Sequence, residues 1–235
     1  IIAHSAVSDL VKKECIRQGA YILNEEEKKK VEKILVGPTG AFNPNIVGLD
    51  GKTLADMAGI KVPDYTRVLI APETGVGKKF PFSIEKLTCI LAFYEAKNLD
   101  DAKYIALSLI RFAGMGHSCA IHANDKERIL NYSSVMPVSR VLVNTPTSQG
   151  AVGYATSLTP SFTLGCGSYG GNATSDNISV LHLFNRKRIA YGVNDISKIK
   201  DFSNGSSNNS MNNIYNDEFI NKIIIEVKKA LNNKI

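Results

Sequence analysis

The sequence predicts an α/β fold with a mainly parallel sheet flanked by helices. Two observations support it: branched, apolar runs that suit buried strands alternate with amphipathic helical stretches, and the links between them are short. The chain has 235 residues, of which 44% are hydrophobic and 21% charged, so it carries enough apolar side chains for a sizeable core.

Each element follows from its local pattern. Apolar side chains at helical spacing predict helices over 6–18 and 25–36, the second capped by Asn24. The chain opens on a strand-like pair, Ile1-Ile2. The other expected elements are an apolar run at 45–48, a short helix at 53–58, strands at 67–71 and 89–94, a helix capped by Asn98, a strand at 118–122, a helix near 125–134, and strands at 140–144 and 187–192.

Composition divides the chain into three parts. Residues 1–197 are predicted to form the α/β domain, although its pattern breaks into Gly, Ser, Thr and Pro between 145 and 177, and a loop this long is more often functional than idle. Residues 198–214 read as a flexible polar linker. Residues 215–235 carry an apolar stripe at helical spacing, which predicts an amphipathic helix.

Charge and composition exclude several classes of function. The net charge is +6, but the lysines are scattered, Trp is absent and no aromatic-basic pattern occurs, so we expect no nucleic-acid partner. No apolar stretch is long enough to span a bilayer, and the first residues do not resemble a signal peptide. The four cysteines lack the spacing of a zinc site and read as reduced thiols, so we predict a cytoplasmic protein without a metal.

The densest cluster of unusual residues is the segment 165–172, where four glycines and Cys166 fall within eight residues. A nucleophilic cysteine would need a lowered pKa and a nearby base. No base lies close to Cys166 in the sequence. We therefore interpret Cys166 as a packed or loop thiol.

Four segments resemble the coenzyme-A-acylating aldehyde dehydrogenases, a group that includes the aldehyde dehydrogenase half of bifunctional aldehyde-alcohol dehydrogenases. They are PFSIEKL at 81–87, GHS at 116–118, MPVSRVLVNTPTSQG at 136–150 and LGCGSYGGN at 164–172. The resemblance runs from the first residue to about Gly192 and implies the fold of an aldehyde dehydrogenase catalytic domain. It also implies an aldehyde substrate, NAD as cofactor, coenzyme A as co-substrate, and self-association as a dimer or larger assembly.

Members of that family convert an aldehyde, NAD and coenzyme A into acyl-CoA and NADH, reversibly, through a cysteine thioester. Their nucleophilic cysteine lies a few residues before the segment that matches residues 1–5, and their dinucleotide-binding domain lies further upstream. Because neither is found in this sequence, we expect the isolated chain to be inactive. A rival hypothesis is a non-catalytic module, derived from the family, that serves assembly or targeting.

The resemblance also implies site residues. Glu85 would accept hydrogen bonds from the nicotinamide ribose, with Leu87 beside it, and His117 would take the proton of the coenzyme A thiol. The structural alternatives are a solvated glutamate and a strand-end histidine satisfied by backbone. A substrate and coenzyme A pocket would be lined by Thr145, Pro146, Thr147, Ser148, Ser161, Phe162, Thr163 and Leu164, which could equally form a turn.

The C-terminal helix at 215–235 resembles the encapsulation peptides that direct enzymes into bacterial microcompartments. That resemblance implies a shell protein as partner and the microcompartment lumen as location. The alternative is an ordinary helix that packs on its own domain or on a neighbouring subunit.

Overall fold

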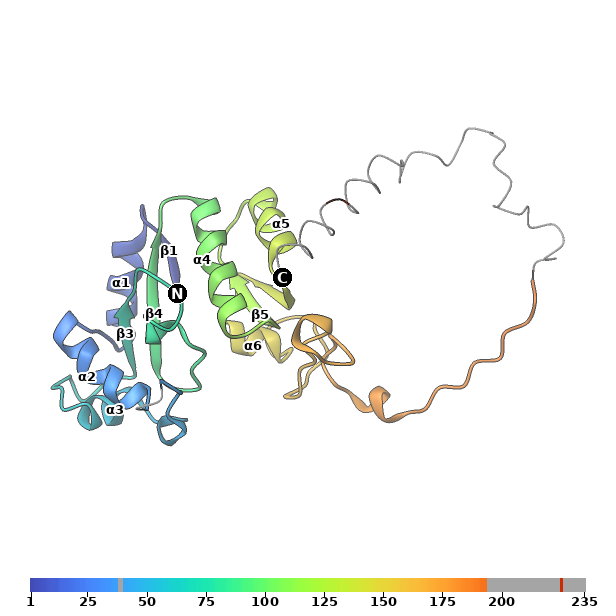
Figure 1. Ribbon diagram of the computed structural model, residues 1–235. Coiled ribbons are helices and arrows are strands. Elements are labelled where there is room, and N and C mark those ends of the chain that lie inside the picture. Colours follow the sequence, from blue (N-terminus) through green and yellow to red (C-terminus); the bar gives the residue numbers. More distant parts are fainter. Residues whose placement is uncertain (38–39, 194–224, 226–235) are drawn as a thin grey trace. The chain divides into compact units, whose positions relative to one another are not determined.

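The structure, a computed structural model, describes residues 1–37, 40–193 and 225 (Figure 1). The chain divides into two units, Ile1–Asn185 and Arg186–Ile235, and each is taken by itself. The predicted domain boundary at residue 197, the linker and most of the predicted C-terminal helix lie outside the described residues; only Ile225 is described there, and it is helical.

The strand predicted at 187–192 is wrong, because residues 185–193 belong to no helix or strand. The apolar side chains that alternate along this stretch do not pack into a core: Ile189 and Tyr191 are 80% and 84% exposed. A strand needs a neighbour that supplies backbone hydrogen bonds. Within the described residues, no other strand pairs with this stretch.

The first unit contains two parallel sheets. Four strands, β1 (Ile2–His4), β2 (Ala20–Ile22), β3 (Val68–Pro72) and β4 (Ile90–Ala96), pair in the order β1-β4-β3-β2. A second pair is formed by β5 (Gly116–Ile121) and β6 (Val138–Val143), with Ser118 opposite Arg140. The prediction of a mainly parallel sheet is thus confirmed, although among the described residues the strands form two sheets and β2 was not anticipated.

The five helices predicted between residues 6 and 134 are confirmed. They are α1 (Ser8–Arg17), α2 (Glu25–Leu35), α3 (Gly51–Met57), α4 (Leu99–Phe112) and α5 (Lys126–Val135). Asn24 and Glu27 form a capping box, in which each side chain accepts a hydrogen bond of 2.9 Å from the other's backbone N–H. The short helix α6 (Thr147–Ala151) and the 3₁₀ turns η1 (Pro44–Ile46), η2 (Pro81–Ser83), η3 (Ser168–Gly170) and η4 (Val180–Leu183) were not predicted.

Apolar side chains cover the four-stranded sheet on both faces. Alternate residues of β3 and β4, such as Leu69 and Ile90, join Val31 and Leu35 of α2 in the main core, which Leu54 of α3 and side chains of α4 extend. The intervening residues Ile70 and Phe93 face α1 in a second cluster. This two-sided burial explains why the strands read as continuous apolar runs.

A third apolar cluster packs α4 and α5 against the β5–β6 pair around Ala106, Tyr132 and Met136. Helix α4 also packs against β1 and β4, so it joins the two sheets of the first unit (Figure 1). Within the described residues, no helix combines the length and the apolar character needed to cross a bilayer.

Candidate functional site

The loop between η2 and β4 carries Glu85 and Leu87, both exposed, whereas Lys86 between them is drawn inward. The Lys86 ammonium donates hydrogen bonds to the carbonyl oxygens of Phe82 and Ile84, the second at 3.0 Å. Burial lowers the pKa of Lys86 to about 8, although attraction to Glu73 opposes the change. Lys86 therefore anchors a loop that presents its two neighbours to solvent.

His117 lies on β5 beside the glycine-rich segment. Its neighbour Gly116 has φ +90°, and a Cβ atom there would overlap the Cys166 carbonyl oxygen and the Gly170 nitrogen. The two backbones are therefore in direct contact, which only glycine permits at this position. The His117 imidazole is exposed, with Nδ1 3.0 Å from the Ser118 hydroxyl oxygen.

The two predicted walls of the pocket lie next to each other. Thr145 is buried just after β6, and α6, which begins at Thr147, packs against β5 and β6. The Ser161 N–H donates to the Val152 carbonyl oxygen at 3.0 Å, which joins the second wall to the end of α6. Phe162 is 97% exposed. Residues 145–148 and 161–164 thus lie on α6 and the segment joined to its end, just past the carboxyl end of β6. His117 lies near the start of β5, at the opposite end of the β5–β6 pair, and Glu85 and Leu87 sit on the separate loop before β4.

A buried arginine at the base of this region was missed by sequence reasoning. Arg140 of β6 is 5% exposed, and its guanidinium donates to the Asn177 side-chain oxygen at 2.6 Å and to the carbonyl oxygens of Gly165 and Ser175, both at 2.9 Å. The Asn177 amide nitrogen donates onward to Ala151 and Thr159 carbonyl oxygens at 2.9 and 2.7 Å. The sequence did carry one signal of this role: Arg140 is the single charged residue in an otherwise largely apolar strand.

Cys166 sits in the same segment. Its backbone N–H donates to the Asn172 side-chain oxygen at 2.9 Å. Among the described residues its thiol has one hydrogen-bond partner, the Leu164 carbonyl oxygen at 3.9 Å. No base contacts the sulfur within the described residues, and the interpretation of Cys166 as a loop thiol stays a prediction.

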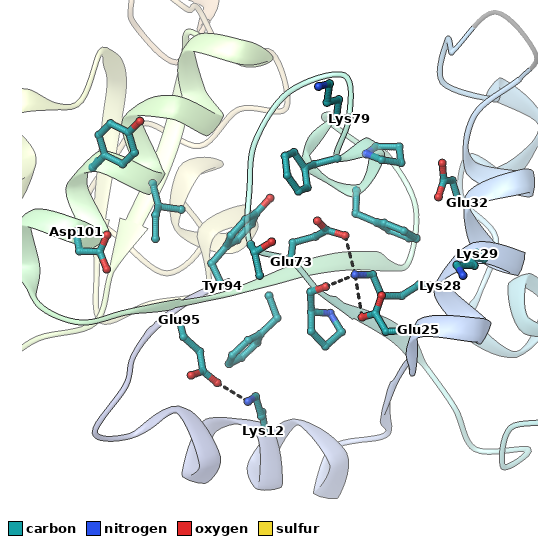
Figure 2. Close-up of a pocket in the computed structure, with 18 residues that line it drawn as sticks. Lys12, Glu25, Lys28, Lys29, Glu32, Glu73, Lys79, Tyr94, Glu95 and Asp101 are labelled. Atoms are coloured by element: carbon teal, nitrogen blue, oxygen red, sulfur yellow. Dashed lines mark hydrogen bonds and ion pairs between the residues drawn. The ribbon is translucent and has the colours of Figure 1, made fainter.

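A cavity of about 850 Å³ opens between α1, α2, α4 and the ends of β3 and β4, and it contains none of the predicted site residues. Figure 2 shows Lys28 directed at Glu73 and Glu25, at 3.0 and 3.3 Å, while Lys12 pairs with Glu95. Burial lowers the pKa of Lys28, but the hydrogen bonds and charges of Glu73 and Glu25 outweigh burial and raise it. The two buried charges of the cavity, Lys28 and Glu73, therefore neutralise each other.

Within 1–37, 40–193 and residue 225, no group of three or more His, Cys, Asp and Glu side chains is placed to hold a metal ion.

Comparison with known proteins gives consistent relatives, although no family model matches the chain. An aldehyde-alcohol dehydrogenase of Clostridium acetobutylicum is 45% identical over 195 residues, which cover 81% of this chain and 22% of that protein. The crystal structure of an acetylating aldehyde dehydrogenase from Geobacillus thermoglucosidasius matches with a TM-score of 0.79 and 45% identity, over 83% of this chain and 43% of that one.

A propionaldehyde dehydrogenase from the fucose utilisation microcompartment of Clostridium phytofermentans matches with a TM-score of 0.65 and 29% identity, over 75% of this chain and 39% of that one. The chain thus spans about a fifth of the length of the curated relative (22%) and less than half of the solved structures (43% and 39%). In both sequence and structure, its homologues are acetylating aldehyde dehydrogenases, as the four segments predicted.

Proposed function

We propose that this chain forms the catalytic-domain portion of a CoA-acylating, NAD-dependent aldehyde dehydrogenase. The overall reaction is aldehyde + CoA–SH + NAD⁺ → acyl–S–CoA + NADH + H⁺. The observation that carries the proposal is that the segment 161–172 links the proposed elements: the Ser161 N–H donates to Val152 at the end of α6, and Cys166 and Gly170 contact Gly116 beside His117. Support comes also from the sequence likeness to an aldehyde-alcohol dehydrogenase.

The loop before β4 fits a nicotinamide ribose. Glu85 is exposed, and within the described residues its carboxylate accepts no hydrogen bond, so both oxygens are available to a pair of ribose hydroxyls. Leu87 offers an exposed apolar surface beside it. NAD, when bound, supplies the acceptor for the hydride of the aldehyde. Lys86 donates hydrogen bonds to two carbonyl groups and so fixes the loop conformation in which Glu85 and Leu87 would contact the nicotinamide ribose.

The region around His117 fits the acyl-transfer step to coenzyme A. The exposed imidazole can accept the proton of the coenzyme A thiol, and the resulting thiolate attacks the carbonyl carbon of the enzyme-bound thioester. The bond to the enzyme sulfur then breaks and acyl-CoA leaves. None of this chain's four cysteines is assigned as that sulfur. The exposed Phe162 ring and the polar residues 145–148 would line the approach.

NADH formation from acetaldehyde tests this proposal, with and without coenzyme A, on this chain and on the chain extended at its N-terminus. The extended chain should form NADH in a coenzyme-A-dependent manner. In that form His117→Ala should slow acyl transfer about a hundredfold and leave the first hydride transfer intact. His122→Ala, an exposed histidine just after β5, is the matched control. An extended chain that forms no NADH contradicts the proposal.

Self-association is a second proposal, carried by exposed apolar side chains. Leu183 and Phe184 in the first unit are largely exposed, as are Ile189, Tyr191 and Val193 in the second. Each unit therefore offers exposed apolar side chains of its own, the kind that interaction sites use. Light scattering on the eluting protein should give a dimer or larger species, and Leu183→Ser with Phe184→Ser should reduce its mass. A monomer at all concentrations contradicts self-association.

For location we propose the cytoplasm, with the lumen of a bacterial microcompartment as the finer hypothesis. The support is the similarity to a propionaldehyde dehydrogenase of a fucose utilisation microcompartment. The segment 215–235, which would contact a shell protein, lies outside the described residues except for Ile225. Residues 212–235 fused to a fluorescent protein should associate with shells; a diffuse signal contradicts the targeting role.

A further inference from the structure

Arg140 is a buried charge that has only neutral partners in the described part of the chain. Its three hydrogen-bond acceptors are two backbone carbonyl groups and the amide oxygen of Asn177. None of the described carboxylates lies within ion-pair distance of the guanidinium. Burying a charge is costly unless its hydrogen bonds are satisfied. The rigid fork of a guanidinium can satisfy several acceptors at fixed angles at once, which an ammonium cannot.

Asn177 extends this network into a second layer. While its oxygen accepts from Arg140, its amide nitrogen donates to the carbonyl oxygens of Ala151 and Thr159. One arginine and one asparagine therefore tie together four separate points of the loop, at residues 151, 159, 165 and 175. These points enclose the proposed pocket wall at 161–164 and the end of the helix that carries Thr147 and Ser148.

The same network connects to the strand of His117. Arg140 is paired in register with Ser118, the residue after His117. The Gly165 carbonyl oxygen accepts a hydrogen bond from Arg140. The next residue, Cys166, is in close backbone contact with Gly116 of β5. A shift of the loop would therefore move it relative to the imidazole.

We propose that Arg140 and Asn177 are positioning residues, which hold residues 151–177 in the conformation that fixes the wall at 161–164 relative to α6 and to the strand of His117. The inference that this conformation serves coenzyme A rests on the proposed function. Neither side chain touches a reactant; each acts through the backbone that it holds.

Two conservative variants separate positioning from simple burial. Arg140→Lys keeps the positive charge but loses the fork. Asn177→Asp keeps the shape and the acceptor oxygen but loses both donors to Ala151 and Thr159. The double variant creates a Lys–Asp pair in the same space. If the two residues served only to balance a buried charge, the double variant would restore the order of the loop. If they position the loop through their hydrogen bonds, the loop stays disordered in the double variant.

Hydrogen exchange measured by mass spectrometry on the full chain tests loop order directly. The Gly165 and Gly167 amides donate to the Asp176 and Thr174 carbonyl oxygens, so they report on this loop. Both single variants and the double variant should exchange about tenfold faster across 145–177, with α2 and β3 unchanged. Arg128→Lys, an exposed arginine of α5, is the control. Unchanged exchange in the loop, or restoration by the double variant, overturns the inference.

Calorimetric titration with coenzyme A connects loop order to binding. In a protein that binds coenzyme A, the two single variants should raise its dissociation constant about tenfold, while Arg128→Lys leaves it unchanged. A loosened loop with unchanged affinity overturns the positioning role. Absence of binding by the unaltered protein, both as this chain and in its extended form, counts against the proposed function; the exchange data then still decide whether the two residues order the loop.

Discussion

The four-stranded sheet with its helices and the loop-rich stretch 152–185 are stabilised by different means. In the sheet, Val31, Leu35, Leu54, Leu69 and Ile90 are completely buried. Between 152 and 185, a stretch described throughout, the buried residues are Gly153, Gly165 and Asn177, and none carries an apolar side chain. The sheet is therefore held by apolar burial, and the loop by the hydrogen bonds of Arg140 and Asn177.

The two means of stabilisation differ in how visible they are in a sequence and in how well they tolerate substitution. Apolar burial is periodic and tolerates substitution by residues of similar volume. A polar network is tied to particular donors and acceptors and has no period. The stretch that carries the second proposed pocket wall therefore relies on particular polar side chains, Arg140 and Asn177.

The largest effect is expected from the sheet core. Phe82 is 1% exposed, and Phe82→Ala should lower the free energy of unfolding by about 4 kcal/mol, because it removes apolar burial and leaves a cavity. Phe162→Ala in the loop should change it by less than about 0.5 kcal/mol, since Phe162 is 97% exposed. Urea denaturation followed by circular dichroism compares the two. Equal losses would contradict the contrast between the two regions.

The buried ion pair of the sheet end gives the next effect. Lys28→Met leaves Glu73, whose side chain is 6% exposed, without its partner and should cost about 3 kcal/mol. Lys28→Met with Glu73→Leu should recover most of that loss, because no unpaired charge remains. Lys29→Met, on the exposed surface of α2, is the control in the same denaturation experiment. A double variant less stable than the single one would show that the pair does more than balance charge.

A smaller effect is expected where the loop-rich stretch contacts β5 of the second sheet. Gly116→Ala combines φ +90° with overlap against the backbones of Cys166 and Gly170, and it should cost about 2 kcal/mol. Gly171→Ala, at φ +70° in open space, should cost about 1 kcal/mol. Limited proteolysis should cleave the Gly116 variant faster within 165–172 than elsewhere. Cleavage spread evenly over the chain would contradict a local contact.

The smallest effect is a pH dependence from Lys86. Its pKa falls from 10.5 to about 8 on folding, so between these values the unfolded chain holds more protons. The contribution of Lys86 to the free energy of unfolding is therefore unfavourable below pH 8 and is relieved as the pH rises toward 10.5. Relative to Lys86→Met, the unaltered chain should gain on the order of 1 kcal/mol between pH 7 and pH 9.5, measured by urea denaturation. A difference that is constant with pH would contradict the burial of this amine.

Periodicity and capping accounted for most of the sheet region. The helices capped by Asn24 and Asn98 form as expected, because an apolar stripe and a capping side chain are local signals. The strand β2 was missed because it has three residues, too few to show a pattern. The strand predicted at 187–192 has the right pattern but lacks a described neighbour, and a pattern cannot supply one.

The candidate site was located by resemblance rather than by periodicity. Its residues fall in a stretch rich in Gly, Ser and Thr, where helix α6 gave no signal because its five residues include a glycine and two hydroxyl side chains. The resemblance named His117 and the two walls; the structure joins the second wall to the end of α6, and their roles stay a prediction. It did not indicate Arg140 as the residue that holds them, because hydrogen bonds to residues 165, 175 and 177 are not visible in a linear pattern.

The sequence by itself determined the α/β class, the positions of the long helices, and the kinship with acetylating aldehyde dehydrogenases, because propensity, apolar period and short motifs are local properties. Only the tertiary structure decided that the strands form two sheets and that Gly116 meets Cys166 and Gly170. It alone also revealed that a buried arginine and asparagine organise loop 145–177. These features depend on contacts between residues far apart in the chain, which no local pattern encodes.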